Sequence, residues 1–250
     1  MAFLRNTDFF LEVSKGNIPK HSSYNVVGIN NDIDTASTPE DVLNTGGTFV
    51  PPTTYRIHNI KSTNAGDGGG GTGWKTLLVK GVVSTGLASE TIVLNGTSNV
   101  ATTNSYSDIY ALIPITVGVN NTNLGDITAT AQIDATVTAS VLIGESNSVK
   151  KCIRLIPPGY TGYIHRWQAT MSQAQQANYC YVQLLYSSDG KVWQVLDIQS
   201  LNNSGSSSEA NMVTTPFKLQ ENYWVKVATT QVSGNNTGVK ATIDIILVEN

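Results

Sequence analysis

Short segments in which apolar and polar residues alternate make up most of the chain from residue 50 onward. This period of two is typical of strands that bury one face, and the segments are rich in Val, Ile, Thr, Tyr and Trp. Turn signals such as Asn95-Gly96 and Asp189-Gly190 separate them. The pattern predicts strands at residues 74–83, 89–97, 107–118, 125–133, 138–144, 151–156, 161–171, 178–188, 191–199, 222–231 and 239–249.

No segment of helical length carries an apolar stripe, and residues 171–179, the nearest candidate, lack one. The chain is therefore predicted to be all-β. Its strands are sufficient for two β-sandwich or jelly-roll-like domains, over residues 51–148 and 149–250, since the pattern breaks near residues 145–158. One large sandwich that interleaves both halves is the alternative.

Residues 1–50 have no sustained period of two or of 3.6, and Gly16, Pro19 and Gly28 interrupt them. We expect an extended N-terminal arm here, with one short helical turn at residues 37–44. An arm without a core of its own must bury its apolar side chains on the parent domain, on another subunit or on a partner. The candidate partner-binding residues are Phe3, Phe9, Phe10 and Tyr24.

Charged residues make up only 13% of the 250 residues, and the net charge is −3. No run of five or more basic residues occurs, whereas nucleic-acid binders concentrate positive charge on one face. We therefore expect no nucleic-acid partner. No stretch approaches the roughly 20 apolar residues of a membrane helix, and the first residues lack the apolar run of a signal peptide. The expectation is no membrane partner and synthesis in the cytoplasm.

Residues 64–76, NAGDGGGGTGWKT, resemble a phosphate-binding loop. Gly68 and Gly73 have the required separation, but Trp74 stands where the lysine belongs and Lys75 comes one position late. A strand pattern follows instead of the helix whose N-terminus would hold phosphate. The sequence therefore predicts a mobile glycine-rich loop that enters a strand, and no nucleotide cofactor.

No other constellation points to catalysis or to a metal. The three histidines, His21, His58 and His165, share no ligand spacing, and no G-x-S-x-G motif occurs. The acidic cluster of Asp32, Asp34, Glu40 and Asp41 lacks the glycine of a calcium loop. We expect no enzyme, no metal and no cofactor. Trp74, Trp167, Trp193 and Trp224 favour core or subunit interface over sugar binding.

Cys152 and Cys180 form no C-x-x-C motif, and their spacing leaves a disulfide open. Two small buried thiols on strands are the simpler interpretation.

Several segments, in order along nearly the whole chain, resemble a family of tailed-phage virion structural proteins. They are VSKGNIPKHSSYNVVGINNDIDTASTPEDVLNTGGTFVPP, KSTNAGDGGGGTGWKTLLVKGV, SETIVLNGTSNVATTNSYSDIY, IPPGYTGYIHRW, PFKLQENYWVKVATT and VKATIDIILVEN. Lys20 departs from the family, which often has glycine there. The resemblance implies a virion component of β-sandwich type without catalytic residues.

The resulting prediction is a non-enzymatic capsid decoration, or cement, protein on the virion surface. We expect a homotrimer that binds the major capsid protein through the arm, and we expect deletion of residues 2–30 to abolish binding while the sandwich still folds. The alternative is a receptor- or glycan-binding module of a tail or head fibre. A hydrolytic enzyme is a third possibility, for which the sequence offers no facing carboxylates.

Overall fold

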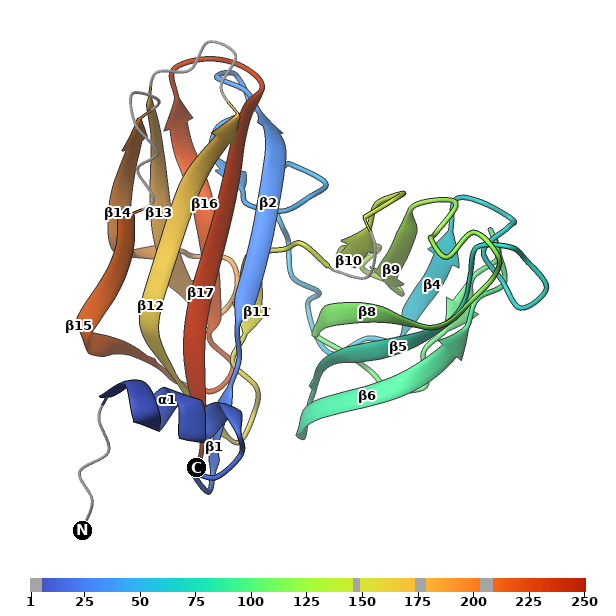
Figure 1. Cartoon of the computed structure of the whole chain (residues 1–250), viewed down its shortest axis with the longest axis horizontal. Helices are drawn as coiled ribbons and strands as arrows, with labels where there is room; N and C mark the ends of the chain where they lie inside the picture. Colours follow the sequence, from blue (N-terminus) through green and yellow to red (C-terminus); the bar gives the residue numbers. More distant parts are fainter. Residues whose placement is uncertain (1–5, 146–148, 174–178, 203–208) are drawn as a thin grey trace.

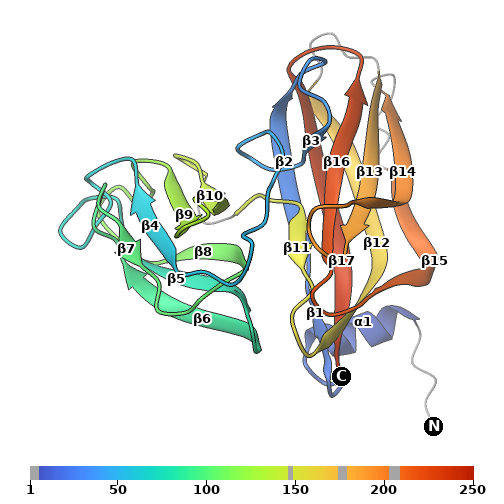
Figure 2. The ribbon, with the colours of Figure 1, turned by 180° about the vertical axis from the view of Figure 1, so that it is seen from behind.

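The computed structural model describes residues 6–145, 149–173, 179–202 and 209–250, and the chain is all-β. Over these residues it has seventeen strands and one helix, α1 (Asn6–Ser14), arranged in four antiparallel sheets. The sheets form two lobes, which lie side by side in Figure 1 and, from behind, in Figure 2. The chain enters the large lobe, crosses to the small lobe and returns.

The large lobe has a front and a back sheet. The front sheet consists of β1 (His21–Ser23), β2 (Val26–Ile33), β12 (Tyr160–Gln173), β15 (Glu209–Leu219) and β17 (Thr237–Glu249). The back sheet consists of β3 (Glu40–Asp41), β11 (Ile153–Leu155), β13 (Tyr179–Ser187), β14 (Gln194–Asn202) and β16 (Trp224–Val232). In the front sheet both β1 and β2 pair with β17, and in the back sheet both β3 and β11 pair with β16.

One apolar core fills the space between these two sheets. The front sheet contributes Trp167 and Ile243, and the back sheet contributes Val182 and Val225, all fully buried. Alternate residues of each strand reach this core, as a period of two requires. Burying such side chains is the main stabilising term of a sheet pair.

The small lobe is built from residues between β3 and β11. Its four-stranded sheet consists of β4 (His58–Ser62), β7 (Val100–Ala101), β9 (Ile127–Ala131) and β10 (Val137–Val141). Its three-stranded sheet consists of β5 (Trp74–Val83), β6 (Gly86–Val93) and β8 (Asp108–Val117). A second core joins the two sheets, with Ile60 and Ile127 from one and Leu77 and Leu112 from the other.

The structure differs from the extended arm that the sequence predicts for residues 1–50. Strand β2 pairs with β17 over most of its length, and its residues Val26 and Ile33 are fully buried in the large core. The predicted helical turn at residues 37–44 is wrong, because Glu40 and Asp41 form β3 against β16. The helix instead lies at α1, before the first strand. This helix lies across one end of the front sheet, beside β1 (Figure 1).

Candidate functional site: the lobe junction and the exposed surfaces

A buried ion pair joins the two lobes. Lys151, just before β11, places its ammonium 2.7 Å from the carboxylate of Asp108 on β8, and both side chains are almost completely buried. Lys151 also donates to the carbonyl oxygens of Ile109 and Thr138 in the small lobe. The other Asp108 oxygen accepts the backbone N–H of Leu155 at 3.2 Å. Burial lowers the pKa of Lys151, while Asp108 opposes that shift.

Aromatic rings surround this ion pair. Tyr24, between β1 and β2, meets Tyr110 of β8 edge to face, with ring centroids 5.5 Å apart. The Arg154 guanidinium lies over the Tyr110 ring, 5.2 Å from its centroid. Lys151 lies over the Phe49 ring in the same way, at 4.5 Å. The lobes therefore meet through paired charges and packed rings, which disfavours free movement between them.

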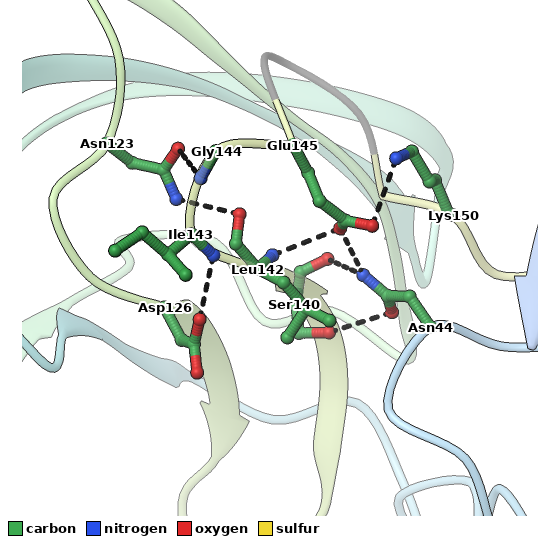
Figure 3. A network of polar contacts seen from close by, with 9 residues as sticks. All are labelled: Asn44, Asn123, Asp126, Ser140, Leu142, Ile143, Gly144, Glu145 and Lys150. Atoms are coloured by element: carbon green, nitrogen blue, oxygen red, sulfur yellow. Dashed lines mark hydrogen bonds and ion pairs between the residues drawn. The ribbon is translucent and has the colours of Figure 1, made fainter. Parts of the chain in front are cut away.

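A second network ties the crossing segments together, as Figure 3 shows. Asn44, on the segment that leaves the large lobe, exchanges hydrogen bonds with Ser140 of β10 and donates to Glu145 at 2.7 Å. Glu145 also accepts from the backbone of Leu142 and pairs with Lys150 at 3.0 Å. One carboxylate thus joins the outgoing and returning chain at the junction.

The helix α1 carries two of the predicted partner-binding residues. Phe10 stacks on His165 of β12, with ring centroids 4.3 Å apart, and Phe9 contacts His21 edge to face at 5.9 Å. Phe9 and Phe10 are half-buried, whereas Leu11 is 52% exposed. Burial lowers the pKa of His165, so the ring that Phe10 covers is neutral near pH 7.

The other two predicted residues lie elsewhere. Tyr24 is buried at the junction, and its hydroxyl donates to the carbonyl oxygen of Leu155. Because the Tyr24 side chain already has its partners within the chain, it does not add to the exposed surface around helix α1. Phe3 lies outside the described residues.

The glycine-rich loop is organised by a buried carboxylate that the sequence reasoning missed. Asp67 is fully buried and accepts hydrogen bonds from the backbone N–H groups of Trp74, Leu124 and Gly125 at 2.9 to 3.1 Å and from the Ser62 hydroxyl at 2.6 Å. The signal in the sequence was an aspartate among glycines, since glycine lets backbone approach a side chain closely. A side chain added at residue 73 would place its Cβ 2.1 Å from an Asp67 oxygen. The sequence predicts a mobile loop here, whereas the structure shows a loop held by hydrogen bonds to Asp67.

A groove runs along the outer face of the back sheet. Trp193 forms part of its wall, and the Lys226 ammonium lies over the indole ring, 4.2 Å from its centroid. Lys226 pairs with Asp41 at 2.6 Å, and burial raises the pKa of that carboxyl. Gln183 also lines the groove. Trp74, Trp167 and Trp224 are buried, so Trp193 is the tryptophan that reaches the surface.

The remaining candidate residues are dispersed. Among the described residues no group of three His, Cys, Asp or Glu side chains is placed to hold a metal ion, and no helix has the length and apolarity to cross a membrane. Asp32 is exposed, while the Glu40 carboxylate accepts from Asn30 and from the backbone of Gly47. Cys152 and Cys180 are both free and buried.

Comparison with protein-family models and with curated proteins finds no match. Among solved structures, the chain is weakly similar to a VP2 subviral particle of infectious bursal disease virus, at 8% identity and a TM-score of 0.19, over 96% of this chain and 78% of that one. The Gt strain of the same virus gives 10% identity and a TM-score of 0.15, over 97% and 82% of the two chains. Likeness at this level carries no argument about fold or function.

Proposed function

We propose that the protein is a non-enzymatic structural component of a tailed-phage virion, a capsid decoration protein that binds the major capsid protein as a homotrimer. In this proposal the two sheet pairs are β-sandwich units, the larger one jelly-roll-like, and the junction holds them as one rigid body. The protein is made in the host cytoplasm and ends on the capsid surface.

The observation that carries the proposal is the position of α1. It is an aromatic helix near the chain's beginning, and among the strands it contacts chiefly β1. Its Phe9 and Phe10 rings rest on two histidines while Leu11 stays exposed. A short helix attached in this way can dock on a neighbouring surface without disturbing either core. Repetition of such a contact over a symmetric shell turns modest binding into firm attachment.

The structure also redefines the truncation that tests this proposal. Deleting residues 2–30 removes most of β2, including buried Val26, so that variant loses front-sheet pairing as well as the helix. Deleting residues 2–14 removes α1 and keeps every strand. The shorter deletion loses the packing of the buried Val13 and the Phe10–His165 stack, so it should lower the urea midpoint while the sheets still form. It should also abolish binding to phage heads that lack the protein, measured by co-sedimentation.

A point variant sharpens the same test. Replacing Phe9 and Phe10 together by Ala should weaken head binding by about a hundredfold, since two rings that each contribute about 1.4 kcal/mol give a factor of ten each. Val192→Ala, which trims an exposed apolar side chain on the β13–β14 loop, is the matched control and should bind normally. Full binding by the double variant would contradict the proposed role of α1.

A second candidate function is glycan or receptor binding from a tail or head fibre. The observation in its favour is the groove beside Trp193, which opens near the exposed pair Tyr179 and Tyr181, with ring centroids 5.4 Å apart. Aromatic rings beside an amide such as Gln183 suit a sugar, which presents apolar faces and hydroxyls. A glycan array on the purified protein tests this, and loss of any signal in Trp193→Ala would assign it to the groove.

A further inference from the structure

The ion pair between the lobes holds an amine and a carboxyl group in contact, away from solvent. The Lys151 ammonium lies 2.7 Å from an oxygen of Asp108, and the two side chains are 4% and 0% exposed. The Phe49 ring covers the ammonium, with its centroid 4.5 Å away. An amine and a carboxylic acid condense to an amide when they meet in their neutral forms, and this pair places both groups side by side.

The surroundings favour the neutral form of the amine. Burial lowers the pKa of Lys151; Asp108 opposes that shift, and the Arg154 guanidinium adds to it. Two charges in a protein interior also retain the cost of their lost hydration. When one proton moves along the hydrogen bond from Lys151 to Asp108, a neutral amine stands beside a neutral carboxyl group, which is the reactive combination.

The contacts of Lys151 orient its amine for attack. Three acceptors surround its Nζ atom: an Asp108 oxygen and the carbonyl oxygens of Ile109 and Thr138. A neutral amine keeps two N–H bonds, and the two carbonyl oxygens accept them. The lone pair then faces the Asp108 carboxyl group. Well-oriented groups within one molecule react as if at an effective concentration of about 10⁵–10⁸ M.

The second oxygen of Asp108 has the hydrogen-bond donor that the reaction needs. Oδ2 accepts the backbone N–H of Leu155 at 3.2 Å. Negative charge collects on this oxygen when the amine attacks the carboxyl carbon, and a fixed backbone donor stabilises such an oxyanion. The same N–H donates to the amide oxygen of the product, and a carbonyl beside Lys151 accepts the amide N–H. The site therefore satisfies the product as well.

We propose that Lys151 and Asp108 condense to an intramolecular amide bond that joins the two lobes covalently. The new bond connects Nζ of Lys151 to Cγ of Asp108, and the bond between Cγ and Oδ1 breaks. Two protons of the ammonium leave with Oδ1 as water, and the third stays on the amide nitrogen. The reaction needs no other reactant. The neutral amide removes two charges from the interior, and its burial keeps away the water that would hydrolyse it.

The bond changes what holds the junction together. It connects β8 of the small lobe to the start of β11 in the large lobe, and a link across such a loop restricts the unfolded chain as a disulfide does. Both cysteines are free, so the thiols supply no such link, and reducing agents do not cleave an amide. The proposal goes beyond the function proposed above and does not depend on it.

Mass spectrometry of the purified full chain tests the proposal. The intact native chain should be lighter than its sequence by one molecule of water. A tryptic digest of the same sample should contain a branched peptide in which Lys151 is joined to Asp108. Because this peptide is sought in the native chain, the result does not depend on whether any variant folds.

Two variants assign the bond. Lys151→Arg keeps the positive charge but lacks the amine, so it should have the full mass of its own sequence. Lys226→Arg is the matched control, because Lys226 also forms a buried ion pair, with Asp41 at 2.6 Å, but lines the groove beside Trp193. This control should still lack one water and should still give the branched peptide.

Three results would overturn the proposal. A native chain of full mass would show that the two residues remain an ion pair. A water missing from Lys151→Arg but not from Lys226→Arg would assign the bond to the other pair. A water lost without a branched peptide, as when an aspartate closes on its own backbone, would reject the cross-link as well. None of these results bears on where the protein lies on the virion.

Discussion

Replacing Asp67 by Asn should destabilise the small lobe far more than the same change at another aspartate nearby. The Asp67 carboxylate is fully buried and accepts hydrogen bonds from three backbone N–H groups and one hydroxyl. Asparagine keeps one acceptor oxygen and turns an NH₂ group toward donors. The perturbation removes the charge and one acceptor while changing the side-chain size very little.

The magnitude follows from the donors that lose their acceptor. If the retained oxygen still serves Trp74, the backbone N–H of Gly125 is left buried without a partner, which costs about 1–3 kcal/mol. The bonds that survive lose their charge assistance, roughly another 1 kcal/mol in total. We expect a loss of about 3 kcal/mol in the free energy of unfolding. With a urea m-value of about 3 kcal/mol/M, the midpoint should fall by about 1 M.

Urea unfolding followed by tryptophan fluorescence measures this loss, since the buried Trp74 begins β5 directly after the loop and its backbone N–H donates to Asp67. The matched control is Asp126→Asn, because Asp126 is half-buried in the same lobe and its side chain accepts one hydrogen bond there, from the backbone of Ile143 at 2.8 Å. The control should cost less than about 1 kcal/mol. Equal midpoints for the two variants would refute the view that Asp67 organises the loop.

Three further outcomes are expected. Burial lowers the pKa of His58 from 6.5 to about 4, so on acidification the unfolded chain takes up the proton before the folded chain does. The free energy of unfolding should therefore be highest above pH 6.5 and fall by about 1 kcal/mol at pH 5.5. Urea midpoints measured against pH should show this loss in the native chain and not in His58→Gln. Lys151→Met leaves the Asp108 carboxylate buried without its cation and should lower the free energy of unfolding by about 3–5 kcal/mol, measured in urea. Adding Asp108→Asn should recover part of that loss, and strictly additive losses would contradict coupling between the two residues. Burial raises the pKa of both thiols, that of Cys180 to about 12. A thiol reagent should therefore modify neither Cys152 nor Cys180 in the native protein and should modify both in urea. Rapid labelling of the native protein would contradict their buried positions.

Strands with a clear period of two could be predicted from the sequence, because that pattern directly reflects one buried face. The predicted segment 74–83 coincides with β5, and 239–249 covers most of β17. The hairpin around Asp189-Gly190 also forms, between β13 and β14, with Gly190 at φ +70°. The nearest helix candidate, residues 171–179, ends β12 and begins β13, and its residues 174–178 lie outside the described residues.

Strand β2 could not be predicted in this way, because tertiary pairing overrides its local sequence. The strand includes the polar stretch Asn30 to Asp32, yet residues on both sides of its register shift pair with β17, more than 200 residues later. Gly28, which the sequence reasoning took as a break, is required by close packing: a Cβ there would lie 2.2 Å from the backbone nitrogen of Cys152. Glycine in a strand marks such an approach as often as it marks an end.

The buried ion pairs could not be predicted from the sequence either. Lys226 lies in a segment predicted as a strand, and Asp41 was assigned to a charged helical turn, but the two form a buried ion pair across 185 residues of sequence. Of the residues predicted to bind a partner, Phe9 and Phe10 lie together on α1, while Tyr24 belongs to the junction.

Cryo-electron microscopy of the purified virion, with density assigned to this chain, tests the central claim most directly. The account predicts trimers on the capsid shell, at three-fold positions or between hexamers, with α1 against the neighbouring surface. Density confined to the tail or to fibres would contradict it and would favour the glycan-binding function of the groove beside Trp193.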